Sequence, residues 1–513
     1  MDDNDNKKGT MMFEAAEVGR KISKSEYKEQ LPELRAQLLQ AQFALSKTNT
    51  PVIIIISGVD AAGRGDAVNA LNEWLDTRGL ETISLDSPTD EELERPYMWR
   101  YWRKLPERGR IGIFFGGWYA DPIRNRAYGE GDFAQFDDAL THIRRFENML
   151  VEDGALILKF WLHLSKHEQK KRLKKLEKDP HTRRSVSEKD WKHAEMYEDF
   201  TGAAEHAIRY TDAGKTPWFL VEATNEQYRN LTIANTLLDH LHKLLKQNQQ
   251  DAEQITSATI EPTIQLEIPS SAQLTVLDKV DLTQVLNKKV YQEKLAHYQG
   301  KLHRLSWAAQ NLNMSTIIVF EGWDAGGKGG AIRRMIHTMD ARLYRVISIA
   351  APTDEERSHH YLWRFWRHAP RGGHFTIYDR SWYGRVLVER VEGFAKEEDW
   401  KRAYSEINSF EEQLANHGDV VIKFWLHLSQ EEQLKRFKER EVIPYKQHKI
   451  TDEDWRNREK WDDYALAVND MVARTSTHYA PWTLIAGDDK RFARIEALQT
   501  VCERLEKAID EKS

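Results

Sequence analysis

The sequence repeats itself at one constant spacing over nearly its whole length. Three motifs, Gly-x-Asp-Ala-x-Gly, Pro-Thr-Asp-Glu-Glu and Lys-Phe-Trp-Leu-His-Leu-Ser, each occur twice, 264 positions apart. They start at Gly58, Pro88 and Lys159 and recur at Gly322, Pro352 and Lys423. Blocks this long at a single spacing indicate two copies of a whole domain and not a short solenoid repeat. A length of 513 residues is enough for two domains with full cores.

The two copies are separated by a stretch that lacks helical periodicity. Residues 247–279 are rich in Gln, Ser, Thr and Pro, as linkers often are. We therefore predict a disordered tail at 1–12, an N-terminal domain at 13–246, a linker at 247–285 and a C-terminal domain at 286–513.

Each copy opens with an amphipathic helix and then alternates apolar runs with helical stretches. The two opening helices are expected at Tyr27–Ser46 and Tyr291–Asn311. Strands that alternate with helices predict a parallel sheet covered on both faces, so the predicted fold class is α/β. The predicted strands are Val52–Ile56, Gly112–Phe115, Leu156–Trp161 and Trp218–Val221, and in the second copy Thr316–Phe320, Phe375–Tyr378, Val420–Trp425 and Trp482–Ile485.

A glycine-rich loop follows the first predicted strand of the second copy and leads into helical residues. Its spacing, Gly322-x-x-x-x-Gly327-Lys328, is that of a phosphate-binding P-loop. We expect Gly322, Gly327 and Gly329 to let backbone amides turn toward phosphate, with the helix N-terminus adding its positive end. Lys328 would reach the outer phosphates. A glycine-rich turn with a helix-capping Asp is the alternative, but the strand and the lysine favour phosphate binding.

Two carboxylates near this loop are candidate ligands of Mg²⁺. The residue after the P-loop lysine, ordinarily a hydroxyl residue, is Gly329, and Asp324 lies inside the loop. Because a carboxylate beside phosphate is repulsive unless a cation lies between them, we take Asp324 as the replacement metal ligand. Asp379 follows a predicted strand directly and is the second expected ligand, with Arg380 suited to a bidentate phosphate contact. A surface Asp-Arg pair at a strand end is the alternative.

A basic stretch follows the strand Val420–Trp425, where P-loop kinases carry a lid that closes over phosphates. We expect Arg436 and Arg440 of this stretch to bind phosphate. Acidic residues are interspersed, so a solvated helix face is the alternative. Further along, Trp461 and Tyr464 could contact a nucleobase, although aromatics at this spacing more often belong to a core.

The composition bounds the remaining possibilities. The net charge of −6 gives no global signal for nucleic acid or an acidic membrane, and no apolar run approaches the length of a membrane span. The first residues lack the apolar core of a signal peptide, and the single cysteine, Cys502, fits a reducing compartment. We therefore expect a cytoplasmic protein without nucleic-acid or membrane partners. Whether it forms a homo-oligomer stays open.

The loop Gly322–Gly330, the segment Asp379-Arg380-Ser-Trp-Tyr and the block Lys423-Phe-Trp-Leu-His-Leu-Ser together resemble the type-2 polyphosphate kinases. The resemblance covers nearly all of both halves. It implies a P-loop kinase core with a helical lid in each half, and two fused copies resemble the tandem subgroup, whose implied activity is polyphosphate-dependent phosphorylation of AMP to ADP with Mg²⁺. Carried over by position, Asp324 and Asp379 would serve Mg²⁺, while Lys328 and Arg380 would hold the transferring phosphate.

The first copy departs from this pattern. Lys328, Asp379 and Arg380 correspond to Arg64, Phe115 and Gly116, and only the loop aspartate, Asp60, remains. We therefore expect one catalytic site per chain, in the second copy. The basic stretch Lys166–Lys192 of the first copy is either a site that binds polyphosphate without turnover or a solvated helix face.

Three other functions are compatible with the residues. One is polyphosphate-dependent phosphorylation of nucleoside diphosphates, and another is an ATP-dependent nucleotide kinase on the same fold. The third is a non-catalytic phosphate-binding scaffold, which the intact set of Asp324, Lys328, Asp379 and Arg380 disfavours for the second copy.

Overall fold

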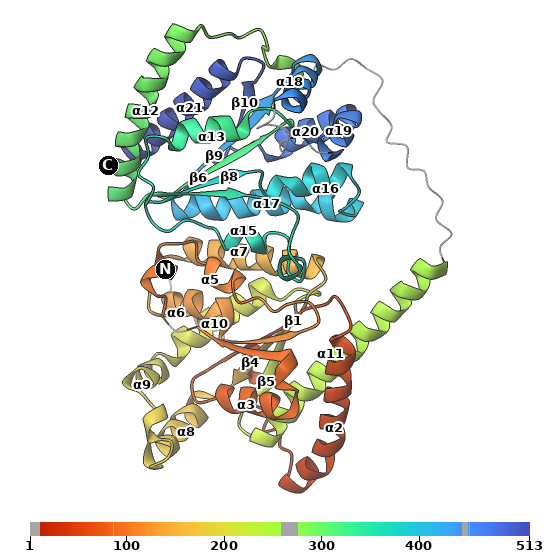
Figure 1. The fold of residues 1–513 in the computed structure, drawn as a ribbon. Helices are drawn as coiled ribbons and strands as arrows, with labels where there is room; N and C mark the ends of the chain where they lie inside the picture. The colour runs from red at the N-terminus through yellow and green to blue at the C-terminus, as the bar shows by residue number, and fades with distance from the viewer. Residues whose placement is uncertain (1–10, 86, 258–274, 444–449, 451, 513) are drawn as a thin grey trace, which may run out of the picture. The chain divides into compact units, whose positions relative to one another are not determined.

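The computed structural model describes residues 11–85, 87–257, 275–443, 450 and 452–512. Within this part of the chain, two compact α/β units each contain one five-stranded sheet (Figure 1). Most of the first copy forms one unit and most of the second copy forms the other, except that residues 88–103 group with the second unit and 354–360 with the first. The predicted fold class, two tandem α/β domains with parallel sheets, is confirmed.

Both sheets are parallel throughout and have the same strand order. The order is β2-β3-β1-β4-β5 in the first copy and, read from the other edge, β10-β9-β6-β8-β7 in the second. The central strands are continuous apolar runs because parallel strands are buried on both faces. The strands are β1 (Val52–Gly58), β2 (Leu80–Ser84), β3 (Ile111–Phe115), β4 (Leu156–His163) and β5 (Trp218–Glu222), then β6 (Thr316–Gly322), β7 (Tyr344–Ser348), β8 (Phe375–Asp379), β9 (Val420–His427) and β10 (Trp482–Ala486).

The eight strands that apolar runs predicted are present, and the structure adds one edge strand to each sheet. These are β2, which pairs only with β3, and β7, which pairs only with β8. Most of their side chains are exposed or half-buried, so neither strand is an apolar run in the sequence. An edge strand needs no two-sided burial, which is why the sequence pattern did not reveal it.

The strand register of the second sheet brings the phosphate loop beside the end of β8. Phe320 at the end of β6 pairs with Asp379, and Gly322 pairs with Leu426 of β9. Because the carboxyl ends of parallel strands share one edge of the sheet, this edge is where an α/β fold binds its ligand. The same register holds in the first sheet, where Ile56 pairs with Phe115.

Helices cover both faces of the second sheet, with α13 and α21 on one side and α17 on the other (Figure 1). The core between the sheet and α12, α13 and α21 is apolar and includes the thiol of Cys502. The helices of this copy are α12 (Lys288–Asn311), α13 (Lys328–Ile336), α14 (Asp354–Arg357), α15 (Trp363–Trp366), α16 (Val388–Val391), α17 (Glu397–His417), α18 (Gln430–Val442), α19 (Asp452–Glu459), α20 (Trp461–Thr475) and α21 (Lys490–Lys512), with one 3₁₀ turn, η5 (Trp382–Val386).

The first copy repeats this arrangement. Helix α11 packs against α2 and α3, while α10 packs against α6 and α7. Its helices are α1 (Met11–Glu14), α2 (Lys24–Leu45), α3 (Arg64–Trp74), α4 (Asp90–Leu93), α5 (Trp99–Trp102), α6 (Ala120–Ala127), α7 (Phe133–Glu152), α8 (Lys166–Lys178), α9 (Glu188–Glu195), α10 (Tyr197–Thr211) and α11 (Glu226–Ser257), with the 3₁₀ turns η1 (Thr77–Gly79), η2 (Gly117–Tyr119) and η3 (Arg183–Ser185). A further turn, η4 (Leu277–Lys279), precedes the second copy.

The predicted tail and linker are described only in part. Helix α11 continues to Ser257, so residues 247–257 are helical although the sequence analysis predicted a linker there, because Gln, Ala and Glu favour a helix even without an apolar stripe. Residues 258–274 lie outside the described part, as do 1–10 of the predicted tail. No helix of the described chain is long and apolar enough to cross a membrane.

A buried ion pair recurs in both copies beneath the sheet edge. The Lys423 ammonium donates to the Glu411 carboxylate at 2.7 Å, to the Tyr383 hydroxyl at 2.7 Å and to a backbone carbonyl at 2.8 Å, and both charged side chains are fully buried. Lys159 and Glu147 repeat the pair at 2.7 Å in the first copy. A buried charge pair persists when its hydrogen bonds are satisfied. This network explains why the Lys-Phe-Trp block recurs in a copy that has lost other site residues.

Candidate active site

The loop between β6 and α13 has the backbone that phosphate binding requires. Gly322 has φ 147°, and a Cβ there would lie 2.6 Å from the carbonyl oxygen of Leu426, so only glycine fits. Gly327 takes the left-handed conformation at the N-cap of α13, and no side chain caps this helix. The first amides of α13 therefore remain available to an anion.

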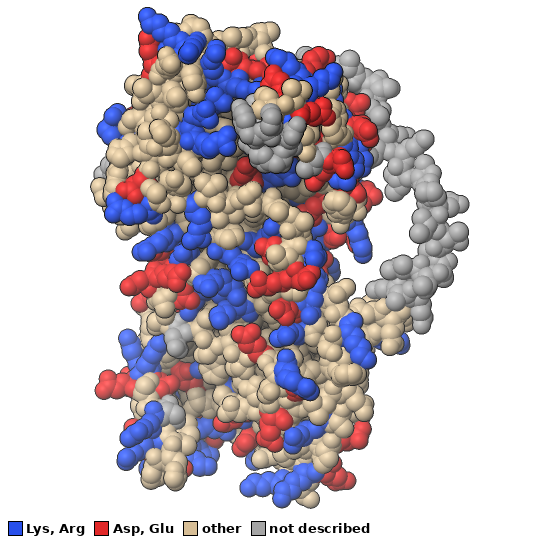
Figure 2. Space-filling model, viewed as in Figure 1, with Lys and Arg blue, Asp and Glu red and all other residues tan. Residues whose placement is uncertain are grey.

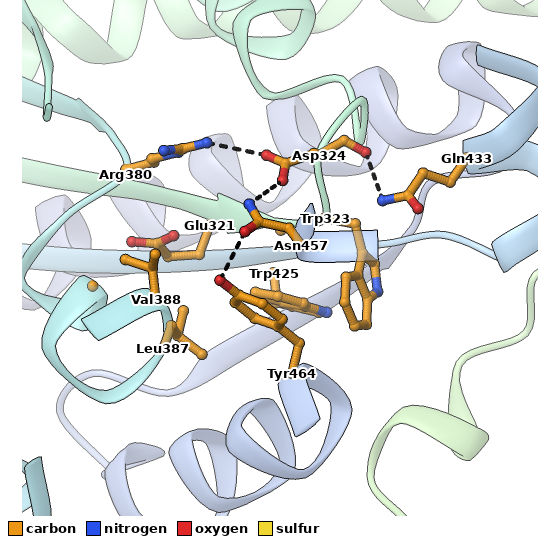
Figure 3. Close-up of a pocket in the computed structure, with 12 residues that line it drawn as sticks. Glu321, Trp323, Asp324, Arg380, Leu387, Val388, Trp425, Gln433, Asn457 and Tyr464 are labelled. Atoms are coloured by element: carbon orange, nitrogen blue, oxygen red, sulfur yellow. Dashed lines mark hydrogen bonds and ion pairs between the residues drawn. The ribbon is translucent and has the colours of Figure 1, made fainter. Parts of the chain in front are cut away.

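Asp324, inside the loop, is held from three sides (Figure 3). One carboxylate oxygen accepts a hydrogen bond from the Arg380 guanidinium at 3.0 Å, and the other accepts one from the Asn457 amide at 2.8 Å. The Gln433 amide donates to the Asp324 backbone carbonyl at 3.2 Å. Two of these partners come from α18 and α19, so the loop aspartate is bonded directly to the predicted lid.

Arg380 lies at the end of β8 in an unusual backbone conformation. Its φ is 64°, in the left-handed region that costs a non-glycine residue about 1–2 kcal/mol. Burial alone would lower the pKa of the guanidinium, but the carboxylates of Asp324 and Glu321 outweigh burial and raise it. Arg380 is thus a fixed cation aimed at the loop.

Lys328 and Asp379 flank the start of α13. The Lys328 ammonium donates to the Gly322 carbonyl at 2.7 Å and to the Trp323 carbonyl at 3.3 Å, so it folds back over its own loop. A Cβ at position 329 would lie 3.8 Å from a carboxylate oxygen of Asp379. Gly329 therefore leaves open the place beside Asp379 where other P-loops carry a hydroxyl side chain. In the described part of the chain, no group donates a hydrogen bond to the Asp379 carboxylate.

Glu321 is a site residue that the sequence analysis did not single out. It is the next-to-last residue of β6, is 5% exposed, and accepts a hydrogen bond from the Ser381 hydroxyl at 2.8 Å. Burial raises the pKa of Glu321, and the neighbouring cations Lys328 and Arg380 only partly offset this. A buried acid with a raised pKa beside two cations is a perturbed group of the kind that clusters at functional sites.

The two predicted lid arginines have different surroundings. Arg436 is buried and donates to the carbonyls of Ala325 at 2.9 Å and Gly487 at 2.7 Å, so it supports the loop from behind. Arg172 makes the matching bonds in the first copy, which points to a structural role. A phosphate contact by Arg436 would require these bonds to break. Arg440 is half-buried and interacts electrostatically with Asp324, so its predicted phosphate contact needs no such change.

A small cavity of about 70 Å³ lies beside Asp324 and Arg380 (Figure 3). Its far wall is apolar and aromatic, and is formed by Leu387, Val388, Trp425 and Tyr464. Trp461 does not line it, because its ring stacks on Trp323 with the centroids 3.7 Å apart. The Tyr464 hydroxyl donates to the side-chain amide oxygen of Asn457 at 3.2 Å. Because the amide nitrogen of Asn457 donates to Asp324, this bond links the wall to Asp324.

The corresponding place in the first copy is filled by the protein's own charges. Arg64 forms an ion pair with Asp60 at 2.7 Å, and its guanidinium lies 5.2 Å from the centre of the Phe115 ring. The His193 ring contacts the other Asp60 oxygen at 2.6 Å and the Tyr128 hydroxyl at 2.6 Å. Burial alone raises the pKa of Asp60, but His193 and Arg64 outweigh it and lower the pKa below its ordinary value.

Comparison of the two copies points to further candidate site residues. Positions that serve only the site of the second copy are free to differ between the copies, while structural positions such as Arg172 and Arg436 stay the same. Arg333 is such a changed position; its guanidinium comes within 4.0 Å of where a Cβ at position 329 would lie. Three further pairs that differ between the copies are Glu321 and Ser57, Asn457 and His193, and Arg333 and Asn69.

The donor set fits a metal ion that is shared with a substrate. Within the described residues, no group of three or more His, Cys, Asp or Glu side chains could hold a metal by itself. Asp324 and Asp379 supply two carboxylates at one edge of the sheet. Mg²⁺ commonly binds through one or two carboxylates together with substrate phosphates and water, so two are enough.

The central strand of this parallel sheet leads into a glycine loop. A lysine follows on the next helix, and an acid lies at the end of the neighbouring strand. These features define a P-loop kinase-like protein. The chain belongs to the polyphosphate kinase 2 (PPK2) family, whose pattern matches residues 21–249 and 285–513.

Relatives match over the whole chain. The polyphosphate:AMP phosphotransferase of Pseudomonas aeruginosa is 50% identical over 97% of this chain and 99% of its own length. A polyphosphate:AMP phosphotransferase of Acinetobacter johnsonii is 37% identical over 92% of this chain and 96% of its own. A crystal structure of a polyphosphate kinase 2 from Pseudomonas aeruginosa has a TM-score of 0.87 at 48% identity, covering 98% of this chain and all of that one.

Proposed function

We propose that the chain transfers the terminal phosphate of inorganic polyphosphate to AMP, giving ADP, and that the second copy alone catalyses this transfer. The observation that carries the proposal is the convergence of Asp324, Lys328, Asp379 and Arg380 on one phosphate loop, in a chain similar over its full length to polyphosphate:AMP phosphotransferases. The first copy lacks three of these four side chains.

The protein's part in such a transfer is positioning and charge neutralisation. The transferring phosphoryl group spreads negative charge over its oxygens, and fixed cations lower the energy of that arrangement. Arg380 is already fixed by Asp324, whereas Lys328 has to exchange two backbone carbonyls for phosphate oxygens. The free amides at the start of α13 add donors that need no reorganisation.

Asp324 and Asp379 would hold Mg²⁺ at this site. When bound, the ion would neutralise the negative charge of the phosphates. The carboxylate of Asp379 is free of hydrogen bonds from the described residues, and that of Asp324 is restrained by Arg380 and Asn457. Asp379 is therefore the more adaptable ligand of the two.

The acceptor nucleotide would bind on the cavity side of Asp324. The wall formed by Leu387, Val388, Trp425 and Tyr464 is suited to an apolar ring system, and Arg380 lies at its polar end. A cavity that holds one benzene ring measures about 150 Å³, so a cavity of about 70 Å³ is too small for a nucleoside, and the lid helices would have to shift before the nucleoside enters. Because a nucleotide phosphate is already ionised at neutral pH, no general base is required.

One assay separates this proposal from its alternatives. Full-length protein is mixed with Mg²⁺ and an acceptor, AMP or a nucleoside diphosphate, and with polyphosphate or ATP as donor, and products are followed by chromatography. We expect ADP from AMP and polyphosphate. A rate with ATP but none with polyphosphate would indicate an ordinary nucleotide kinase, and a preference for diphosphate acceptors would reassign the acceptor. No product from any pair would leave only a phosphate-binding scaffold.

A further inference from the structure

The silent copy carries more positive charge over its lid than the catalytic copy does. Residues 166–192 contain eleven Lys and Arg against five Asp and Glu, whereas the aligned residues 430–456 contain seven of each. The excess of six positive charges therefore lies in the copy that lacks the catalytic side chains. Loss of catalysis alone gives no reason for cations to accumulate there.

Most of these cations are unpaired and face solvent. Lys174, Lys175 and Lys178 of α8 and Arg183 and Arg184 of η3 are exposed, and within the described chain none of the five forms an ion pair. We call these five residues the basic lid surface. Figure 2 shows lysine and arginine side chains projecting from the region that α8 occupies in Figure 1.

In the lid of the catalytic copy, several cations are paired with carboxylates. Lys435 and Arg436 share the carboxylate of Glu432, at 3.0 Å and 2.8 Å. Arg456 and Lys460 similarly share a buried carboxylate at 3.1 Å and 3.0 Å. These four cations are thus neutralised by the protein itself, whereas those of the basic lid surface are left to an external anion.

Leaving the basic lid surface unpaired has an energetic cost in the free protein. Lysines four positions apart on a helix repel each other, at a cost of a few tenths of a kcal/mol per pair. Helix α8 holds four such pairs: Lys166 with Lys170, Lys170 with Lys174, Lys171 with Lys175, and Lys174 with Lys178. A bound polyanion would turn this repulsion into attraction.

We infer that the basic lid surface of the first copy is a docking site for inorganic polyphosphate; this inference rests on the proposed function. The donor of that reaction is a linear polyanion, and the surface offers cations without any Phe, Tyr or Trp on α8 or η3. Single-stranded nucleic-acid sites combine cations with aromatic side chains that stack on bases, so the surface fits a polymer without bases better. A chain held by the first copy raises the donor concentration available to the second copy of the same molecule.

The test uses the full-length chain with Lys174, Lys175 and Lys178 all changed to Glu. A matched control carries three reversals at other exposed helical lysines of the same copy: Lys28, Lys243 and Lys246. We expect the KM for polyphosphate of several hundred units to rise about tenfold or more in the first variant, because phosphate contacts dominate such affinity. The kcat and the KM for chains of a few phosphates should stay within about twofold, since such a chain contacts too few cations of the basic lid surface to bind there.

Direct binding provides the second readout. In a Lys328→Ala background, end-labelled long polyphosphate should bind the chain with an affinity that the triple reversal lowers by a similar factor and the control reversal does not. An unchanged KM and affinity, or equal losses in the control, would overturn the inference. Tighter binding of labelled single-stranded RNA that polyphosphate does not displace would also overturn it.

Two further controls keep the result interpretable. If the reversal variant is not folded by circular dichroism, Lys174→Gln, Lys175→Gln and Lys178→Gln together remove the charge more gently, with the same expected direction. If the wild-type protein does not transfer phosphate from polyphosphate of any length, the proposed function fails. The binding readout still decides whether the surface docks polyphosphate.

Discussion

Arg380 and Gly116 occupy corresponding positions of the two copies and share a left-handed backbone, with φ values of 64° and 78°. The backbone N–H of Arg380 donates to the Phe320 carbonyl at 3.1 Å, and that of Gly116 donates to the Ile56 carbonyl at 2.9 Å. The conformation therefore belongs to the fold, and glycine is the residue that suits it. The second copy keeps an arginine there against the strain, which is expected where a side chain is needed for function.

This relationship predicts a trade between stability and activity at position 380. Arg380→Gly and Arg380→Ala both remove the guanidinium, so both should lose about 10²–10³-fold in turnover. Arg380→Gly should nevertheless be more stable than Arg380→Ala by about 1 kcal/mol, because only glycine relieves the left-handed strain. Turnover and the free energy of unfolding measured on the same preparations check this. Equal stabilities would mean that the backbone at this position carries no strain.

Asp60 and Asp324 are the aligned loop aspartates, and we predict that they matter in different ways. Asp60→Asn should cost about 1.5–3 kcal/mol of stability at pH 7, since hydrogen bonds to charged groups contribute in this range, and should leave turnover unchanged. Asp324→Asn should lower turnover and weaken the response to Mg²⁺. Loss of turnover in Asp60→Asn with the fold intact would show that the first copy takes part in catalysis.

The stability that Asp60 contributes should also depend on pH and should decrease on acidification. Because the pKa of Asp60 is lowered in the folded protein, its contribution is fully present above its unfolded pKa of about 3.9 and is lost as pH falls through the folded value. The stability difference between wild type and Asp60→Asn should therefore shrink as pH falls below about 4. Chemical unfolding at a series of pH values measures it. A difference that grew on acidification would contradict the sign.

The buried ion pairs predict equal effects in the two copies. Lys423→Met and Lys159→Met each leave a buried glutamate without its cation, which commonly costs about 3–5 kcal/mol. Both should lower stability by similar amounts as followed by calorimetry. A Lys423→Met protein of normal stability but without turnover would instead make this lysine part of the catalytic machinery.

Asn457 is predicted to act as a positioning residue for Asp324. Asn457→Ala removes the 2.8 Å bond from the lid helix to the carboxylate, and the loss of such an outer partner typically costs about 10–100-fold in metal affinity or activity. The Mg²⁺ concentration for half-maximal rate should rise accordingly. Glu459→Ala, an exposed change on the same helix, should leave it unchanged. An unaltered Mg²⁺ response in Asn457→Ala would separate this residue from the metal site.

The parts of the fold that the sequence predicted are those with strong local signals. Gly322, Gly327 and Lys328 could be placed because strand, loop and helix are contiguous, and the apolar strands could be placed because parallel strands are buried on both sides. The edge strands β2 and β7 could not, since exposed side chains give no apolar run. The helical continuation of α11 was missed because it lacks an apolar stripe.

Site residues contributed by distant segments were harder to predict. Asn457 lies 133 positions after Asp324, and an asparagine on a polar helix carries no motif of its own. Glu321 precedes a strong motif but is apparent only from its burial and the Ser381 bond. The role of Arg436 depends on which carbonyls it meets, and its charge alone suggested a phosphate ligand. The predicted phosphate contacts stay predictions.

The central claim is that phosphate transfer belongs to the second copy alone. The most direct measurement is the rate of ADP formation from AMP, long polyphosphate and Mg²⁺ by two full-length variants of verified fold. Lys328→Ala combined with Asp379→Ala should form no ADP above background, although Asp60 and Arg64 are intact. Arg64→Ala should keep the wild-type kcat. Substantial ADP formation by the double variant, or loss of turnover in Arg64→Ala, would contradict the account.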